Sequence, residues 1–186
     1  MTNQKIGKTK SGGYFVFTSN VDGQFQEAGY RGDRIVECHG SIHYFQCLNN
    51  CSDEVYYADP DDIEVEIDEE LFEAREPLPK CENCGSVARP NILMFNDADY
   101  NSNRGNQQSK RLEAWLGTTR DSGLTIIELG AGTVIPTVRD FSEDLARRDK
   151  VTLIRINQHE YNVPNGQISI NLGAKEAINR IYQLLE

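Results

Sequence analysis

The chain has 186 residues, a hydrophobic fraction of 38% and a charged fraction of 26%, which are typical of a globular domain and exclude a disordered chain. Its net charge of −10 argues against direct, nonspecific binding to nucleic acid. No apolar run approaches a membrane span and the polar, lysine-bearing start does not resemble a signal peptide, so we expect a cytoplasmic protein that enters no membrane.

The first predicted strand, Gly13–Thr18, is followed by two polar side chains. Asn20 and Asp22 come directly after this β-rich run, at the carboxyl end of the strand, where α/β sheets face their ligand crevice. Taken alone, the pair predicts an Asx turn with Gly23 equally well.

A second strand is predicted over Asp33–Cys38, and His39 follows it. A strand end that opens onto a glycine, here Gly40, is where α/β proteins present reactive side chains. A histidine at such a point suits a general base near neutral pH. From this residue alone, a structural or solvated imidazole is an equally good interpretation.

The alternation of strands and helices breaks off between residues 45 and 88. Residues 59–76 contain ten acidic residues and one arginine, which we interpret as a solvated surface, with an affinity for basic protein tails as the alternative. Ile63, Val65 and Ile67 alternate with glutamates, which predicts a strand with one face in water. We therefore expect residues 45–88 to form an insert.

Four cysteines of this insert have the spacing of a zinc site. Three residues separate Cys47 from Cys51 and two separate Cys81 from Cys84, and thiolates so spaced converge on Zn²⁺. Gly85 permits a positive φ, which lets backbone N–H groups point at sulfur. Disulfides are disfavoured in a reducing compartment, and a redox pair usually opens a helix. Four thiolates close the coordination sphere, so we expect a structural ion.

The second half of the chain alternates continuous apolar runs with amphipathic patterns. The runs predict buried strands and the patterns predict helices. This alternation favours an α/β fold with a Rossmann-like, mostly parallel sheet, formed by residues 1–44 and 89–186, and a small inserted zinc-binding module, residues 45–88. The predicted strands are Leu124–Leu129, Val151–Ile156 and Ile168–Ile170, and the predicted helices are Gln108–Leu116, Thr137–Arg148 and Ala174–Glu186.

A glycine-rich segment, Gly130-Ala131-Gly132-Thr133, lies between a predicted strand and a predicted helix. Glycines in this position let backbone N–H groups approach a phosphate or a ribose. The motif is short, and a tight turn between strand and helix explains it equally well.

Taken in order, these segments resemble the sirtuin family of Sir2-type, NAD-dependent protein deacylases. The resemblance runs from about Tyr14 to the end of the chain. Its strongest pieces are Thr18–Asp22, His39-Gly40-Ser41, the four cysteines and Arg89–Phe95. Gly130–Pro136, Ile156-Asn157 and the helix that opens at Gly173-Ala174 support it.

The resemblance implies an NAD-dependent protein-lysine deacylase (deacetylase), a transferase that releases nicotinamide and O-acyl-ADP-ribose. NAD is then a co-substrate, Zn²⁺ is structural, and the partner is an acyl-lysine protein or peptide. His39 is implied as general base, and Asn20 as the side chain that orients ribose or water. The implied cofactor-binding residues are Ser19, Asn20, Asp22, Gly130, Gly132, Thr133 and Asn157, and Ile92, Leu93 and Phe95 are implied to pair with the substrate peptide.

The sequence also departs from the family pattern. The glycine-rich segment that binds the pyrophosphate, and the flexible loop after it, have no counterpart in residues 1–12. Ser19 replaces a usual glutamine, Phe25 a usual histidine and Asn96-Asp97 a usual Gly-Glu. We expect weak dinucleotide binding without the pyrophosphate segment. Two alternatives therefore stay open: a truncated, non-catalytic zinc-containing binding module, and an NAD glycohydrolase or ADP-ribosyltransferase using the same histidine.

Overall fold

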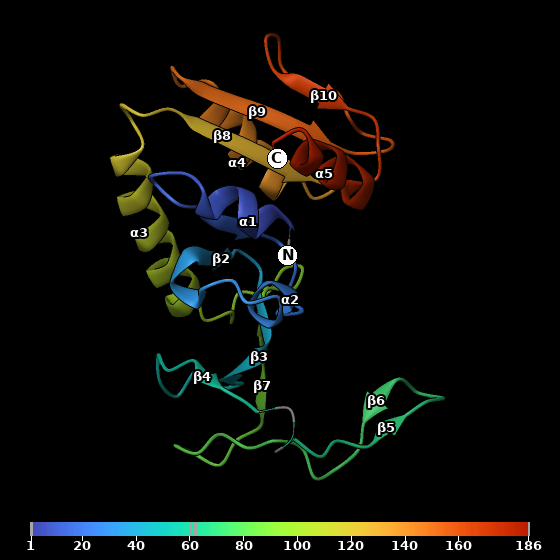
Figure 1. The fold of residues 1–186 in the computed structure, drawn as a ribbon. Helices are drawn as coiled ribbons and strands as arrows, with labels where there is room; N and C mark the ends of the chain where they lie inside the picture. Colours follow the sequence, from blue (N-terminus) through green and yellow to red (C-terminus); the bar gives the residue numbers. More distant parts are fainter. Residues whose placement is uncertain (1, 60, 62, 186) are drawn as a thin grey trace. The chain divides into compact units, whose positions relative to one another are not determined.

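The structure is a computed structural model that describes residues 2–59, 61 and 63–185, and it divides into two compact units. Unit 1 consists of Met1–Val16 with Arg111–Glu186, and unit 2 consists of Phe17–Lys110. Figure 1 labels the helices and strands of both units. Neither unit coincides with the predicted insert, so the boundaries at residues 45 and 88 stay a prediction.

Unit 1 is built on a parallel sheet of three strands in the order β10-β9-β8. Leu124 pairs with Val151 at one end of the sheet, and Ile170 pairs with Ile156 at the other. The bounds equal those predicted from the apolar runs, because such runs suit strands that are buried on both faces. The strands are β8 (Leu124–Leu129), β9 (Val151–Ile156) and β10 (Ile168–Ile170).

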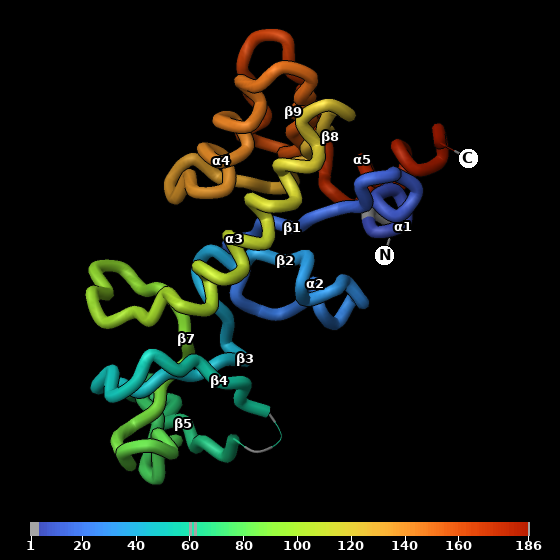
Figure 2. Tube along the Cα trace, turned by 90° about the vertical axis from the view of Figure 1, so that its left-hand side faces the viewer, coloured from blue at the N-terminus to red at the C-terminus, as the bar shows by residue number. Residues whose placement is uncertain are grey.

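Helices cover both faces of this sheet, with α4 on one side and α5 and α1 on the other (Figure 2). Ile156 of β9 packs against Ile178 of α5 in the apolar core. Its neighbour Arg155 points to the opposite face, as successive strand residues do, and reaches Glu143 of α4 at 2.9 Å. The helices are α1 (Thr2–Lys8), α4 (Thr137–Ala146) and α5 (Ala174–Gln183), and the predicted helix end at Glu186 lies outside the described residues.

The helix α3 (Asn103–Thr118) begins five residues before the predicted start at Gln108. The N–H of Asn103 donates to the side-chain oxygen of Asn101 at 3.0 Å, which satisfies one donor of the first turn. This turn is polar and carries no apolar periodicity, so the pattern of the sequence could not reveal it. No helix in the described part of the chain has both the length and the apolarity needed to cross a bilayer.

The strands described in unit 2 form three short sheets. The predicted strands Gly13–Thr18 and Asp33–Cys38 appear as the shorter pair β1 (Val16–Thr18) and β2 (Ile35–Glu37). β3 pairs antiparallel with both β4 and β7, and Figures 1 and 2 show the three side by side. The remaining elements are α2 (Gln24–Glu27), η1 (Gly32–Arg34), β3 (Gly40–Cys47), β4 (Tyr56–Tyr57) and β7 (Ala88–Ile92).

The predicted strand across Ile63, Val65 and Ile67 is wrong for most of its length. Only Ile67–Asp68 is a strand, β5, which pairs with β6 (Glu73–Ala74) in a hairpin. Ile67 is 58% exposed, because no other sheet in the described part of the chain packs against the apolar side of this segment. The acidic side chains described in residues 59–76 are exposed except that of Asp68, which pairs with Arg75 at 2.9 Å; this agrees with a solvated surface.

Candidate active site and metal centre

Two predicted polar segments, residues 19–22 and 39–41, lie side by side in unit 2. The N–H of Cys38, at the end of β2, donates to the carbonyl oxygen of Thr18, at the end of β1, at 2.9 Å. The N–H of Ile42 donates to the carbonyl oxygen of Val21 at 2.9 Å. These two hydrogen bonds flank Asn20, so the segment that carries it is fixed beside the segment that carries His39.

Asn20 and Asp22 differ in how their side chains are used. The backbone N–H of Asn20 donates to Thr18 Oγ1 at 3.0 Å, while its exposed side-chain amide has no hydrogen-bond partner among the residues that the structure describes. One carboxylate oxygen of Asp22 accepts the N–H of Gln24 at 3.2 Å, which is the contact of an Asx turn. Ser19 is half-buried between them and β1. The amide of Asn20 thus makes no contact within the described residues, whereas Asp22 uses one carboxylate oxygen to close the turn.

His43 of β3 holds this loop, a role that no motif of the sequence indicated. Its Nε2 lies 3.2 Å from the carbonyl oxygen of Asp22. Gly23 has a φ of +70°, and a Cβ there would meet the His43 ring at 2.6 Å. The glycine after the Asn-x-Asp segment was visible in the sequence, but the ring that requires it comes from another strand. The imidazole and the loop are thus packed against each other.

His39 occupies the turn between β2 and β3, next to the predicted peptide-binding segment. Its carbonyl oxygen accepts the N–H of Leu93 at 3.0 Å, and Gly40 pairs with Ile92. Leu93 and Phe95 expose 40% and 83% of their surface, whereas Ile92 is half-buried. The structure therefore brings Ile92 and Leu93 to the histidine turn, and Leu93 and Phe95 are open to solvent.

A buried ionic group supports the strand that leads to His39. Glu37 is 1% exposed and forms a salt bridge with Arg104 of α3. Gln108, one turn further along α3, accepts the N–H of Glu37 at 3.1 Å. The Arg104 guanidinium lies 3.7 Å from the centroid of the Tyr44 ring. Because a buried carboxylate needs such partners, this group ties α3 to β2 and β3.

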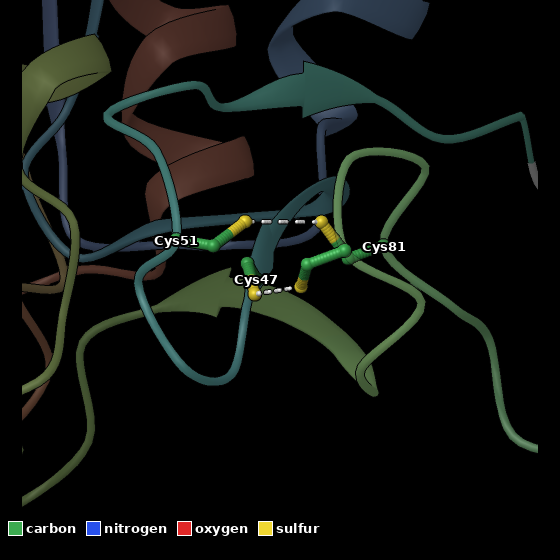
Figure 3. Close-up of side chains that lie close together, drawn as sticks. Cys47, Cys51 and Cys81 are labelled. Atoms are coloured by element: carbon green, nitrogen blue, oxygen red, sulfur yellow. Dashed lines mark hydrogen bonds between the residues drawn. The ribbon is translucent and has the colours of Figure 1, made fainter.

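The four predicted metal ligands converge in unit 2. The Sγ atoms of Cys47 and Cys84 are 3.6 Å apart, as are those of Cys51 and Cys81, and all four lie within 4.8 Å of one another. Figure 3 shows the sulfurs turned toward a common centre from two loops. A tetrahedral Zn²⁺ with bonds of ~2.3 Å requires sulfur–sulfur separations of about 3.8 Å. The cluster therefore fits a zinc ion.

Hydrogen bonds within the cluster shift the pKa values of two thiols in opposite directions. The N–H and hydroxyl groups of Ser86 beside Cys84 lower the pKa of its thiol to about 6. Hydrogen bonding to the other three cysteines, chiefly Cys84, raises the pKa of Cys51 to about 12. The predicted positive φ at Gly85 is present, at +73°; its N–H donates to the carbonyl oxygen of Cys81 at 2.8 Å, and the backbone N–H that reaches the Cys84 sulfur is that of Ser86. Stabilised thiolate in a closed set of four sulfurs is the donor chemistry that Zn²⁺ requires.

The cluster is separate from His39. β3 runs from Gly40 to Cys47, and a strand of this length spans roughly 25 Å. The fifth cysteine, Cys38, lies beside His39 and outside the cluster; burial raises the pKa of its thiol to about 11. The four sulfurs that lie within reach of one ion exclude Cys38, so the metal belongs to the far end of β3.

The predicted nucleotide-binding residues of unit 1 also come together. The segment 130–133 follows β8 and Asn157 follows β9, at the carboxyl ends of two adjacent parallel strands. The side-chain N–H of Asn157 donates to the carbonyl oxygen of Ala131 at 3.1 Å, and the N–H of Gly130 donates to that of Ile156 at 3.0 Å. Gly130, Gly132, Thr133 and Asn157 therefore belong to one loop cluster in the position where parallel sheets bind ligands.

Glu160, which the sequence did not single out, lies against this cluster. Its carboxylate accepts the N–H of Thr133 at 3.1 Å and the Thr133 hydroxyl, and these bonds lower its pKa, the hydroxyl contributing most. Its own N–H donates to the side-chain oxygen of Asn157 at 3.0 Å. Arg139 of α4 donates to the carbonyl oxygens of Ala131 and Glu160. One donor of the glycine-rich loop is thus already used by a carboxylate.

Comparison with known proteins bears on this arrangement. A profile of the Sir2 family matches residues 5–115. The chain is 36% identical over 155 residues to a "Probable bifunctional ADP-ribose hydrolase/ADP-ribosyltransferase" of Fusarium oxysporum f. sp. cubense, covering 76% of this chain and 25% of that protein. It is 34% identical over 95 residues to an "NAD-dependent protein deacylase" of Pyrococcus furiosus, covering 51% and 32%.

The match to a third relative covers nearly the whole chain. The "NAD-dependent protein deacetylase 2" of Caldanaerobacter subterraneus subsp. tengcongensis is 25% identical over 171 residues, covering 92% of this chain and 58% of that protein. The chain thus spans between a quarter and about three fifths of the length of these relatives. The profile match covers more than half of the chain and includes His39 and all four clustered cysteines. The chain belongs to the Sir2 family.

Proposed function

We propose that the chain carries out NAD-dependent removal of acyl groups from protein lysines, with His39 as the general base. One observation carries the proposal: two hydrogen bonds hold the Asn20 segment beside the His39 turn, and a third joins His39 to Leu93. A base, an amide and an extended surface for a peptide therefore adjoin within unit 2. This combination is what acyl transfer from a peptide side chain requires.

Each residue has a distinct role in the proposal. NAD, when bound, supplies the ribose that accepts the acyl group, with nicotinamide as the leaving group. The imidazole of His39 takes a proton from a ribose hydroxyl near neutral pH. The unpaired amide of Asn20 orients the ribose or a water, and Asp22 holds the carboxamide of nicotinamide. Histidine and amide thus divide proton transfer and positioning between them.

The adenosine end of the dinucleotide is assigned to unit 1, while Ser19 is proposed as a further cofactor-binding residue of the Asn20 segment. Gly130, Gly132 and Thr133 form the loop after β8, and Asn157 closes it from β9. Support comes from their position at the carboxyl ends of parallel strands. We expect this loop to bind NAD weakly in the observed arrangement, because the N–H of Thr133 already donates to Glu160.

The substrate is proposed to be an acyl-lysine protein or peptide in the cytoplasm. Ile92 ends β7 and Leu93 and Phe95 follow it, and we expect the peptide to add to this segment through backbone hydrogen bonds. Leu93 and Phe95 offer apolar contact surface because they are exposed. The zinc module supports the fold at the opposite end of β3 and takes no part in the chemistry.

ADP-ribosyl transfer or NAD hydrolysis is the second candidate function. It is favoured by the Fusarium relative, whose name states ADP-ribose hydrolase and ADP-ribosyltransferase activity and whose match covers 76% of this chain. The same His39 and Asn20 would serve it. The products separate the candidates: O-acyl-ADP-ribose marks deacylation, free ADP-ribose marks hydrolysis and a modified protein marks transfer. A non-catalytic binding module would form none of these.

Replacing His39 tests the assignment of the base. We expect His39→Ala to lower nicotinamide release from NAD, in the presence of an acetyl-lysine peptide, by at least ~100-fold, as the loss of a general base does. The assay compares both variants on this chain and on a form extended upstream of Met1. Zinc content and melting temperature serve as controls, because the length of β3 separates His39 from the four clustered cysteines. An intact variant with full turnover would refute the role of His39.

A further inference from the structure

A hollow of about 390 Å³ lies at the amino ends of β8 and β9 in unit 1. The two loops that precede these strands meet there, since the N–H of Leu124 donates to the carbonyl oxygen of Lys150 at 3.0 Å and Lys150 Nζ donates to that of Asp121 at 3.4 Å. The glycine-rich loop follows the opposite end of β8, a strand of six residues that spans roughly 20 Å. The hollow is therefore distinct from the nucleotide loop proposed above.

The lining of the hollow is cationic in a protein of net charge −10. Arg120, Arg148 and Lys150 line it, against the single carboxylate of Asp149. A concave surface with an excess of one charge concentrates ligands of the opposite charge. The local reversal of sign therefore favours an anionic ligand over a neutral one.

The two arginines that line the hollow have unused hydrogen-bond donors. Among the residues that the structure describes, the guanidinium groups of Arg120 and Arg148 have neither a hydrogen bond nor an ion pair. The adjacent Arg147, by contrast, pairs with Asp144 at 2.9 Å and does not line the hollow. A guanidinium presents paired N–H groups that match the oxygens of a phosphate, so two of them in one hollow suit a phosphate dianion.

The remaining wall and the size of the hollow define the rest of the ligand. Leu116, Leu124 and Val151 supply an apolar surface beside the cations. Clefts for small molecules begin at roughly 300 Å³, which is far more than a bare phosphate fills. We propose that this hollow binds a phosphate ester of nucleotide size, with the phosphate on Arg120 and Arg148 and the less polar part against the leucines.

Titration followed by nuclear magnetic resonance of backbone amides tests the site. The probes are inorganic phosphate, adenosine monophosphate and adenosine, and the reporters are Gly123 and Lys150 at the hollow with Gly130 and Thr133 at the other end of β8. We expect phosphate and the nucleotide to shift the first two amides, and the nucleotide to bind at least ~10-fold more tightly than phosphate. Adenosine should leave them unchanged. Shifts confined to Gly130 and Thr133, or equal affinity for phosphate and nucleotide, would overturn the proposal.

Variants identify the groups responsible. The double variant R120Q/R148Q should bind the nucleotide at least ~10-fold more weakly at the hollow, because each charge-assisted hydrogen bond contributes more than a neutral one. Asp149→Asn should raise the affinity about threefold, since it removes the only carboxylate of the lining. Arg147→Gln is the matched control and should change nothing. Unchanged affinity in the double variant would show that the arginines do not bind the ligand.

Discussion

Gly40 joins the His39 turn to β3 with a φ of +81°, and a Cβ at this position would lie 1.9 Å from the carbonyl oxygen of Asn91. Gly40→Ala must therefore push β7 away from β3, in addition to straining its own backbone. We expect the free energy of unfolding to fall by at least about 3 kcal/mol. Urea denaturation measures this loss.

Gly29 provides the matched control, because it has the same φ of +81° but a Cβ added there would have no atom within 4 Å. Gly29→Ala carries only the strain of the left-handed conformation, about 1 kcal/mol. Equal losses in both variants would show that backbone conformation, and not the contact with Asn91, makes Gly40 necessary.

Asp97 belongs to the loop that presents Leu93 and Phe95, and it is 2.8 and 2.9 Å from the two terminal nitrogens of Arg89. This arginine holds the pKa of Asp97 below its usual value. A carboxyl whose folded-state pKa is lowered stabilises the fold above its unfolded pKa of about 4, and the contribution is lost as the pH falls through the folded value. Asp97→Asn should therefore flatten the fall of melting temperature below about pH 4.

The control for this pH dependence is Asp99→Asn, since Asp99 is exposed and forms no ion pair among the described residues. Melting temperatures between pH 3 and pH 7 compare the two variants with the unmodified chain. If the Asp97 and Asp99 variants follow the same profile, the Arg89 pair contributes nothing measurable to acid stability.

At the scale of the element, β3 carries the His39 turn at one end and Cys47 at the other, and its partner β7 follows the second cysteine pair. A zinc ion bound by all four cysteines therefore fastens β3 to the loop that leads into β7. We expect one zinc per chain, and removing it or introducing Cys81→Ser should lower the melting temperature by roughly 10 °C. Atomic absorption and thermal denaturation measure the two quantities.

Cys38→Ser is the control for the zinc prediction, because Cys38 lies outside the cluster. It should retain the metal. A zinc-free preparation that melts at the same temperature as the zinc-bound protein would contradict a structural role for the ion.

At the scale of the whole molecule, the zinc cluster lies in unit 2, whereas the parallel sheet and its apolar core lie in unit 1. A chelator should therefore accelerate amide hydrogen exchange mainly within Phe17–Lys110 and leave β8 and β9 protected. Exchange followed by mass spectrometry resolves the two units. A uniform loss of protection along the chain would mean that the two units unfold together.

The sequence by itself determined the features that depend on neighbouring residues. The apolar runs of β8 and β9 predicted their bounds, because a strand covered on both faces is mostly apolar, and the charged exceptions Glu128 and Arg155 pair with each other. The two cysteine pairs predicted the cluster, because two pairs with this close spacing are typical of a zinc site. The order of the motifs predicted the Sir2 family, which the profile match confirms.

Only the tertiary structure decided which distant groups meet. Arg104 and Glu37 are 67 residues apart, His43 and Asp22 are 21 apart, and Glu160 and Thr133 are 27 apart. The cationic hollow likewise arises where two separate loops adjoin at the ends of parallel strands. Such contacts depend on which distant segments the folded chain places next to each other. The sequence around one partner therefore does not identify the other.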